Sequence, residues 1–151
     1  MLNDSLYSSA KMDWGTPESL FRALDEEFAF DLDVCATHAN AKCRRFFSPQ
    51  DDGLSKSWDG MVWMNPPYGR GIDQWVRKAY SESASGCVCV CLLPVRSDTK
   101  WWHDYVMKSK EIRLLTRRLS FDGAKNKAPF PAAIVVFGGK DNSPVLKAMR
   151  V

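Results

Sequence analysis

The sequence predicts an α/β protein of three layers, in which a mostly parallel sheet carries an antiparallel hairpin at its edge. Two observations support this fold class. Over the first two thirds of the chain, segments with apolar residues at helical spacing alternate with short apolar runs, which is typical of strands joined by helices. Over the last third, strand-like runs follow one another with no helical segment between them, and neighbours connected in this way pair antiparallel.

The expected helices are marked by apolar residues that recur every three or four positions. The first has a clear start, because Thr16 can act as N-cap of a helix whose first residue is Pro17. Asp98 can cap a later helix in the same way. On this basis we expect helices at 16–27, 72–83, 98–107 and 144–149, with at most a short one within 39–44.

The expected strands are short runs of apolar or alternating residues. The run Cys87–Leu93 is continuously apolar and ends at Pro94, as is typical of a strand buried on both faces. The dipeptide Asp122-Gly123 is a turn signal before a basic loop. The strands expected on these grounds cover 28–34, 61–64, 87–93, 112–115, 118–121 and 132–137.

The composition is that of a soluble globular protein, with 45% hydrophobic and 26% charged residues in a chain of 151. This length fits a single domain, which we expect over residues 13–151, after a loose polar arm at 1–12. Neither a membrane span nor a signal peptide is visible, so a cytoplasmic protein is expected. The net charge of +3 is small, so any nucleic-acid surface must come from local clusters of basic residues.

The five cysteines do not predict a metal site, because no Cys-x-x-Cys pair occurs and the two histidines are isolated. Cys87, Cys89 and Cys91 alternate along one apolar run, which places them on one face of a strand. An odd number of cysteines in a chain without a secretion signal favours reduced thiols. We therefore expect buried cysteines and no metal.

The most informative motif is Asn65-Pro66-Pro67-Tyr68, which follows the expected strand 61–64 and precedes a glycine. An Asn side-chain oxygen and the Pro66 carbonyl can accept the two N–H bonds of an exocyclic amino group, which makes its nitrogen a better nucleophile. Two prolines keep the loop extended, and Tyr68 offers a flat face for a base turned out of a duplex. A plain tight turn is the alternative. The position at a strand's carboxyl end favours function.

This motif resembles the catalytic loop of amino-group methyltransferases that use S-adenosylmethionine. With further blocks, the chain is similar to the phage-type DNA N-6-adenine methyltransferases of the Dam family over roughly residues 14–137. The resemblance implies a Rossmann-like methyltransferase sheet of reduced size, S-adenosylmethionine as cofactor, and methyl transfer to the N-6 amino group of adenine in DNA. The blocks that carry it are 14–17, 30–36, 52–54 with Trp58, 65–69 with Trp75, 78–79, 92–94, 118–121, 128–131 and 135–137.

The resemblance also implies roles for residues outside the motif. Trp14, Thr16 and Pro17 lie against the methionine part of the cofactor, whereas Asp33 meets its amino group or ribose and Asp52 its adenine amino group. The structural alternatives are core packing for Trp14, helix capping for Thr16 and a turn for Asp52. A carboxylate at position 33 is harder to explain by structure alone, because a buried acid at a strand end needs a partner.

The resemblance further assigns the target base to Tyr68, with Phe121 or Phe130 as the opposite wall, although either Phe can equally belong to the core. DNA binding is supported by local charge, because basic residues cluster around the expected hairpin and follow the motif directly. A solvated basic face is the alternative. The residues expected to contact the DNA backbone are Arg70, Arg113, Arg117, Arg118, Lys125 and Lys127.

Two departures from the wider methyltransferase pattern leave alternatives open. Residues 36–38 stand where a Gly-x-Gly loop normally follows the first strand, which leaves open a catalytically decayed DNA-binding module. No separate target-recognition domain is expected, so target choice must come from loops 37–58 or 116–130, or from a second subunit in a homodimer. An RNA or a protein glutamine is the alternative substrate. The choice of adenine over cytosine rests on the resemblance, as does protection against restriction in a phage-infected host cell.

Overall fold

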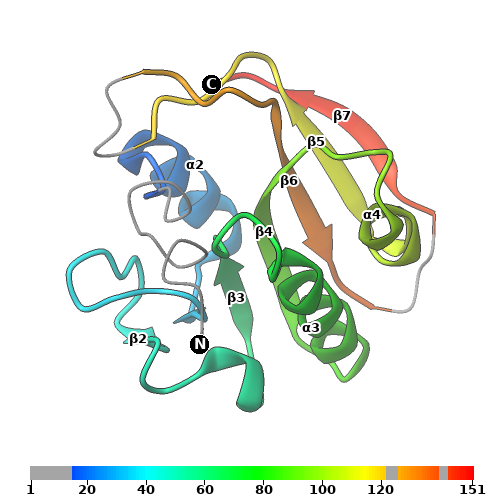
Figure 1. Ribbon diagram of the computed structural model, residues 1–151. Coiled ribbons are helices and arrows are strands. Elements are labelled where there is room, and N and C mark those ends of the chain that lie inside the picture. Colours follow the sequence, from blue (N-terminus) through cyan, green and yellow to red (C-terminus); the bar gives the residue numbers. More distant parts are fainter. Residues whose placement is uncertain (1–14, 122–125, 140–142) are drawn as a thin grey trace.

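The computed structural model describes residues 15–121, 126–139 and 143–151. In this part of the chain the strands form one sheet of seven, drawn in Figure 1. They are β1 (Leu32–Asp33), β2 (Arg45–Phe46), β3 (Met61–Met64), β4 (Val88–Pro94), β5 (Glu111–Leu115), β6 (Ala132–Phe137) and β7 (Val145–Met149). The strand order is β2-β1-β3-β4-β6-β5-β7.

The sheet is mostly parallel, as the sequence predicts. Strands β2, β1, β3 and β4 run parallel to one another, and β7 runs parallel to β5. Only β6 is antiparallel to its neighbours β4 and β5 among the described strands. The expected antiparallel pair is confirmed in β5 and β6, but it does not lie at the edge of the sheet, because β7 pairs with β5 outside it and the edges are β2 and β7.

Helices lie on both faces of the sheet (Figure 1). They are α2 (Glu18–Phe28), α3 (Ile72–Ala84) and α4 (Lys100–Asp104), with 3-10 turns η2 (Gly53–Ser55) and η3 (Val106–Lys108). On one face, Phe21 of α2 meets the Trp63 ring of β3 at 5.6 Å. On the opposite face, Tyr80 of α3 meets Phe137 of β6 at 6.4 Å. Every residue of β6 is buried between these layers. None of the helices in the described segments has the length and apolar character needed to cross a bilayer.

The strongest local patterns predict their elements well: 61–64, 72–83, 87–93, 112–115 and 132–137 are all confirmed to within a residue or so. The first strand is much shorter than predicted. Phe28 still belongs to α2, and Ala29 caps that helix in the left-handed region at φ 54°. Only two residues remain in β1. The helix considered within 39–44 is a hydrogen-bonded turn from Thr37 to Ala41, which leads into β2.

Three further expectations are corrected. Residues 118–121 form no strand, and the helix expected at 144–149 is instead the parallel strand β7, whose partner β5 lies more than thirty residues earlier in the sequence. Thr99, not Asp98, caps α4, because its hydroxyl accepts from the Trp102 amide at 3.4 Å. The turn expected at Asp122-Gly123 and the arm at 1–12 lie outside the described residues.

Candidate active site

The candidate site lies at one edge of the sheet, where the parallel strands β1, β3 and β4 end. Asp33 is the last residue of β1, Asn65 follows directly on β3, and Leu92 lies near the end of β4. The carboxyl ends of parallel strands meet at the same edge, and open α/β sheets bind their ligands there. The expected motif therefore stands where a substrate site belongs in this architecture.

Asn65 is held by a residue from the start of α2. Its Nδ2 donates a hydrogen bond to the Thr16 hydroxyl at 3.0 Å, and both the Thr16 side chain and the Asn65 Oδ1 atom are buried. This bond turns the other end of the amide, Oδ1, away from Thr16. Thr16 was expected to cap the helix, but Pro17 is the N-cap residue and no side chain caps it. The Thr16 hydroxyl orients the Asn65 amide instead.

The two prolines contribute no N–H groups to the loop, so the backbone offers no competing donors beside Asn65. Pro66 is buried and Pro67 half-buried. The Tyr68 hydroxyl donates to the Leu92 carbonyl at 3.1 Å, which ties the loop to β4. The Tyr68 side chain is 5% exposed, and burial raises the pKa of its hydroxyl, so it stays a neutral donor.

Tyr68, Phe121 and Phe130 come together in one aromatic cluster. The Tyr68 ring meets Phe130 at 5.3 Å with an interplanar angle of 69°, and Phe121 at 6.3 Å with an angle of 87°. These are edge-on contacts, whereas a base stacked between two rings needs parallel planes about 7 Å apart, two layers of about 3.5 Å each. In this arrangement the Phe rings close on Tyr68 and do not face it across an open slot.

Asp33 is 2% exposed and holds the loop that follows β1. Its Oδ1 accepts from the Cys35 amide at 3.3 Å and its Oδ2 from the Lys42 amide at 3.0 Å. Burial raises the pKa of Asp33, and these two backbone bonds counteract the rise only in part. Within the described residues no cation forms an ion pair with it. A ligand with a positive charge and N–H donors fits this carboxylate, which keeps lone pairs to accept them.

The segment that carries Asp52 packs closely against the end of β1. A Cβ atom on Gly53 would collide with the Val34 carbonyl and lie 3.3 Å from the Trp75 ring. The Gly53 carbonyl in turn accepts from Trp58 Nε1 at 2.8 Å. Glycine is therefore required at position 53, and the close approach leaves the exposed Asp52 at the rim of the site, with φ of 56°.

Other expected residues lie elsewhere. The Arg113 guanidinium is buried and pairs with Glu27 at 2.6 and 2.7 Å and with Glu111 at 2.5 Å, so its charge is already compensated inside the protein. This placement does not suit the expected contact with DNA phosphates. Pro17 lines a cavity on the α2 side of the sheet, and its expected place beside the cofactor stays a prediction. Trp14 and Lys125 lie outside the described residues.

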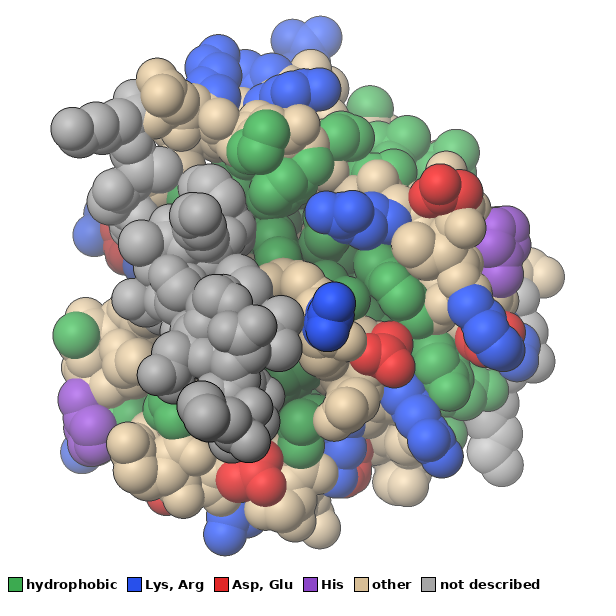
Figure 2. Space-filling model, in the orientation of Figure 1, with side chains coloured by type: hydrophobic (Ala, Val, Ile, Leu, Met, Phe, Trp, Pro, Cys, Tyr) green, Lys and Arg blue, Asp and Glu red, His purple; other side chains and the backbone are tan. Residues whose placement is uncertain are grey.

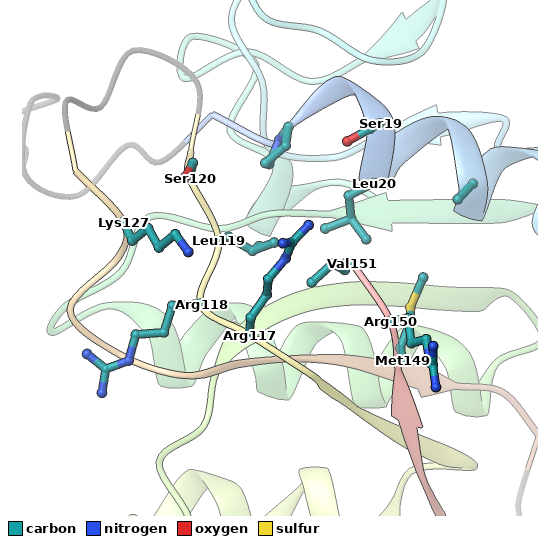
Figure 3. Close-up of a pocket in the computed structure, with 12 residues that line it drawn as sticks. Ser19, Leu20, Arg117, Arg118, Leu119, Ser120, Lys127, Met149, Arg150 and Val151 are labelled. Atoms are coloured by element: carbon teal, nitrogen blue, oxygen red, sulfur yellow. The ribbon is translucent and has the colours of Figure 1, made fainter.

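The remaining basic residues are on the surface. Arg70 is exposed directly after the motif, and Arg117, Arg118 and Lys127 line the same cavity as Pro17 (Figure 3). Figure 2 shows basic side chains gathered at this end of the molecule beside an apolar surface. Sequence reasoning missed Arg150 in this cavity, because the strand before it, β7, was expected to be a helix and the pairing of β7 with β5 has no local signal. No group of three or more metal-ligating side chains occurs within the described ranges.

Comparisons with known proteins cover most of the chain. The family described as "DNA N-6-adenine-methyltransferase (Dam)" matches residues 4–137, which include Thr16, Asp33 and Asn65. A protein named "DNA N-6-adenine-methyltransferase" from Haemophilus phage HP1 (strain HP1c1) is 36% identical over 120 residues, which cover 77% of this chain and 69% of that protein. A protein of the same name from Escherichia phage T1 is 27% identical over 135 residues, covering 87% of this chain and 56% of its own length.

Proposed function

Because the chain belongs to the DNA N-6-adenine-methyltransferase (Dam) family, we propose that it transfers a methyl group from S-adenosylmethionine to the N-6 amino group of adenine in DNA. The observation that carries this proposal is the Asn65 amide, held by Thr16 at the carboxyl edge of the sheet. We infer that its buried Oδ1 and the carbonyl of the next residue, Pro66, act together as two acceptors for one exocyclic NH2 group.

The two acceptors act on the electronic structure of the amino group. Its lone pair is delocalised into the adenine ring in the ground state, which makes the nitrogen planar and a poor nucleophile. Hydrogen bonds to Asn65 Oδ1 and the Pro66 carbonyl favour a tetrahedral nitrogen, which exists only as the reaction proceeds. They also strengthen as the nitrogen becomes positive and its protons more acidic, so they stabilise the transition state more than the ground state. No strong general base is required.

Tyr68 supplies the surface for the target base, turned out of the duplex. The Tyr68 ring is fixed by the hydrogen bond from its hydroxyl to the Leu92 carbonyl. Room for the base must therefore come from the neighbouring rings of Phe121 and Phe130. We infer that Phe130, on the segment just before β6, moves aside when the base enters. Stacking on a rigid aromatic ring then offsets part of the cost of unstacking the base from DNA.

The residues at the end of β1 suit the cofactor. When bound, S-adenosylmethionine supplies an electrophilic methyl group on a positively charged sulfur. Asp33 would hold its cationic methionine end, because this buried carboxylate has no ion-pair partner among the described residues and burial raises its pKa. Asp52, exposed at the rim formed by η2, would accept from the adenine amino group of the cofactor. Trp14, Thr16 and Pro17 remain proposed neighbours of the methionine part.

DNA would contact exposed basic side chains near the motif and the aromatic cluster. Arg70 follows the motif directly, and Arg117, Arg118 and Lys127 are exposed on the segments that lead to Phe121 and Phe130. Lys125 is proposed with them. Arg113 is left out of this set because Glu27 and Glu111 hold it.

A methyl-transfer assay with labelled S-adenosylmethionine tests the function, with duplex DNA, RNA and protein fractions offered separately. We expect label in DNA alone. Calorimetric titration with S-adenosylmethionine should show binding in the same preparation. Label in RNA or protein, or no binding of the cofactor, contradicts the proposal.

A further inference from the structure

A cavity of about 410 Å³ lies on the α2 side of the sheet, beside the candidate active site. Three segments that are distant in the sequence form its walls (Figure 3). They are the first turn of α2 with Pro17 and Ser19, the stretch 117–120 with Lys127, and the end of the chain at 149–151.

The lining is strongly basic. Arg117, Arg118, Lys127 and Arg150 contribute to it, and no carboxylate side chain does. Within the described ranges none of these four cations forms an ion pair. In Figure 3, Arg117 and Lys127 point into the space beside Leu119, whereas Arg118 and Arg150 point outward at its rim. Arg117 and Lys127 therefore bring positive charge into one cavity without an ion-pair partner among the described residues, and a bound anion would offset that charge.

The start of α2 adds to the attraction for an anion. This helix has 11 residues, and the amides of its first turn have no acceptor within the helix. Ser19 and Ser120 bring hydroxyl donors to the same cavity. Phosphate is bound in proteins by donors of these kinds, namely guanidinium and ammonium groups, hydroxyls and the amides at a helix start.

Two of the walls continue into the active site. Pro17 directly follows Thr16, whose hydroxyl binds Asn65. Leu119 is followed closely by Phe121, and its carbonyl accepts from the Ala128 amide at 2.8 Å, just before Phe130. Both Phe rings contact Tyr68. A group bound in the cavity is therefore a near neighbour of the base site.

We propose that this cavity binds a backbone phosphate of the DNA strand that carries the target adenine, next to the base that leaves the duplex. The inference rests on the proposed function and adds a place where the strand is held. It also gives the end of the chain a role, since Arg150 lies beyond residues 4–137, which the family covers. Pairing of β7 with β5 and the ion pair of Lys147 with Glu111 at 2.9 Å fix this end against the sheet.

The test compares Arg117→Gln and Arg150→Gln with Arg77→Gln, an exposed arginine of α3 that faces away from α2. Binding to a short duplex of mixed sequence is measured by fluorescence anisotropy over a range of salt concentrations. We expect each cavity variant to bind about tenfold more weakly, as for loss of a charged hydrogen bond. The slope of log K against log salt should fall in magnitude by about 0.9, the value for one phosphate contact. Arg77→Gln should match the wild type in both respects.

A second measurement locates the phosphate. Once sequencing of modified bases has identified the target site, duplexes are made with a single uncharged methylphosphonate at successive positions near the adenine. Wild-type protein should bind more weakly to the duplex with the methylphosphonate at one particular position. Arg117→Gln should bind that duplex and the unmodified duplex equally well. The proposal is overturned if the methylphosphonate lowers the affinity of wild type and variant equally at every position. It is also overturned if the cavity variants bind DNA as tightly as Arg77→Gln. Either result leaves the proposed function intact, provided that the wild type methylates DNA. If the wild type methylates no DNA at all, the proposed function fails first and this inference fails with it.

Discussion

Asn65 and Thr16 are joined by a hydrogen bond of 3.0 Å although 49 residues separate them in the sequence. The bond connects the loop after β3 with the residue before the N-cap of α2, and these two segments meet only in the folded sheet. It fixes which end of the Asn65 amide is turned toward Thr16 and hence where Oδ1 lies. The position of the acceptor that we propose for the target amino group therefore depends on a hydroxyl from another element.

Thr16→Val tests this dependence, because valine keeps the shape of the side chain and removes the hydroxyl. We expect kcat to fall about tenfold, since the loss of one oriented bond lets the amide rotate. Affinity for DNA should change little, because Thr16 makes no proposed contact with the backbone. Steady-state methylation rates and DNA binding measure the two effects. Thr16→Ser, which keeps the hydroxyl, is the matched control and should retain most of the activity. Equal loss in both variants would show that packing, not the hydrogen bond, is what matters.

Gly53→Ala is expected to destabilise the fold by about 1–3 kcal/mol, as for overpacking in a tight site. The added Cβ would collide with the Val34 carbonyl, which is backbone and cannot rotate away. The control is Gly71→Ala, at a position where a Cβ has open space around it. Urea unfolding of the two variants gives the comparison. A Gly53→Ala protein as stable as Gly71→Ala would contradict the close approach of η2 to β1.

The ion pairs of Arg113 predict a pH dependence of stability. The hydrogen bond from Arg113 lowers the pKa of Glu27 below its ordinary 4.5. A carboxylate with a lowered pKa stabilises the fold above its unfolded pKa, and this contribution is lost as the pH falls through the folded value. We therefore expect Arg113→Met to be less stable than wild type by about 1–2 kcal/mol at neutral pH, less than for a fully buried pair because Glu27 is half exposed.

The same variant should lose less stability than wild type when the pH drops below 4.5, because Glu27 no longer has a lowered pKa. Thermal unfolding across this range measures the effect. Arg22→Met is the control, since the Arg22–Glu18 pair is a surface pair with side chains 76% and 55% exposed. Parallel pH profiles for wild type and Arg113→Met would contradict the assignment of Arg113 to a structural role.

The sequence predicts those parts of the fold whose signal is local. The apolar runs of β3, β4 and β6 and the amphipathic spacing of α3 each identify an element without reference to the rest of the chain. The strand β7 could not be predicted in this way. The apolar spacing of residues 145–149 suits a short helix as well as a strand, and pairing with β5 decides between them.

The candidate site shows the same division. The motif at 65–68 and its place after a strand can be read from the sequence, because the strand and the prolines are contiguous with it. The role of Thr16 could not, since a threonine before a proline and an acid also fits a helix cap. Arg113 was expected to face DNA because sequence shows the basic cluster around it. Its partner Glu27, 86 residues away, is adjacent only in the fold.

The central claim is that Asn65 accepts a hydrogen bond from the amino group that receives the methyl group. It is tested most directly by mass spectrometry of nucleosides from duplex DNA that purified protein has treated with S-adenosylmethionine. We predict N6-methyladenine with the wild type and a yield lower by about a hundredfold or more with Asn65→Ala, as for the loss of one preorganised polar contact. Cofactor affinity should be nearly unchanged. An Asn65→Ala protein that methylates adenine at the wild-type rate, or a wild type that forms no N6-methyladenine, contradicts the account.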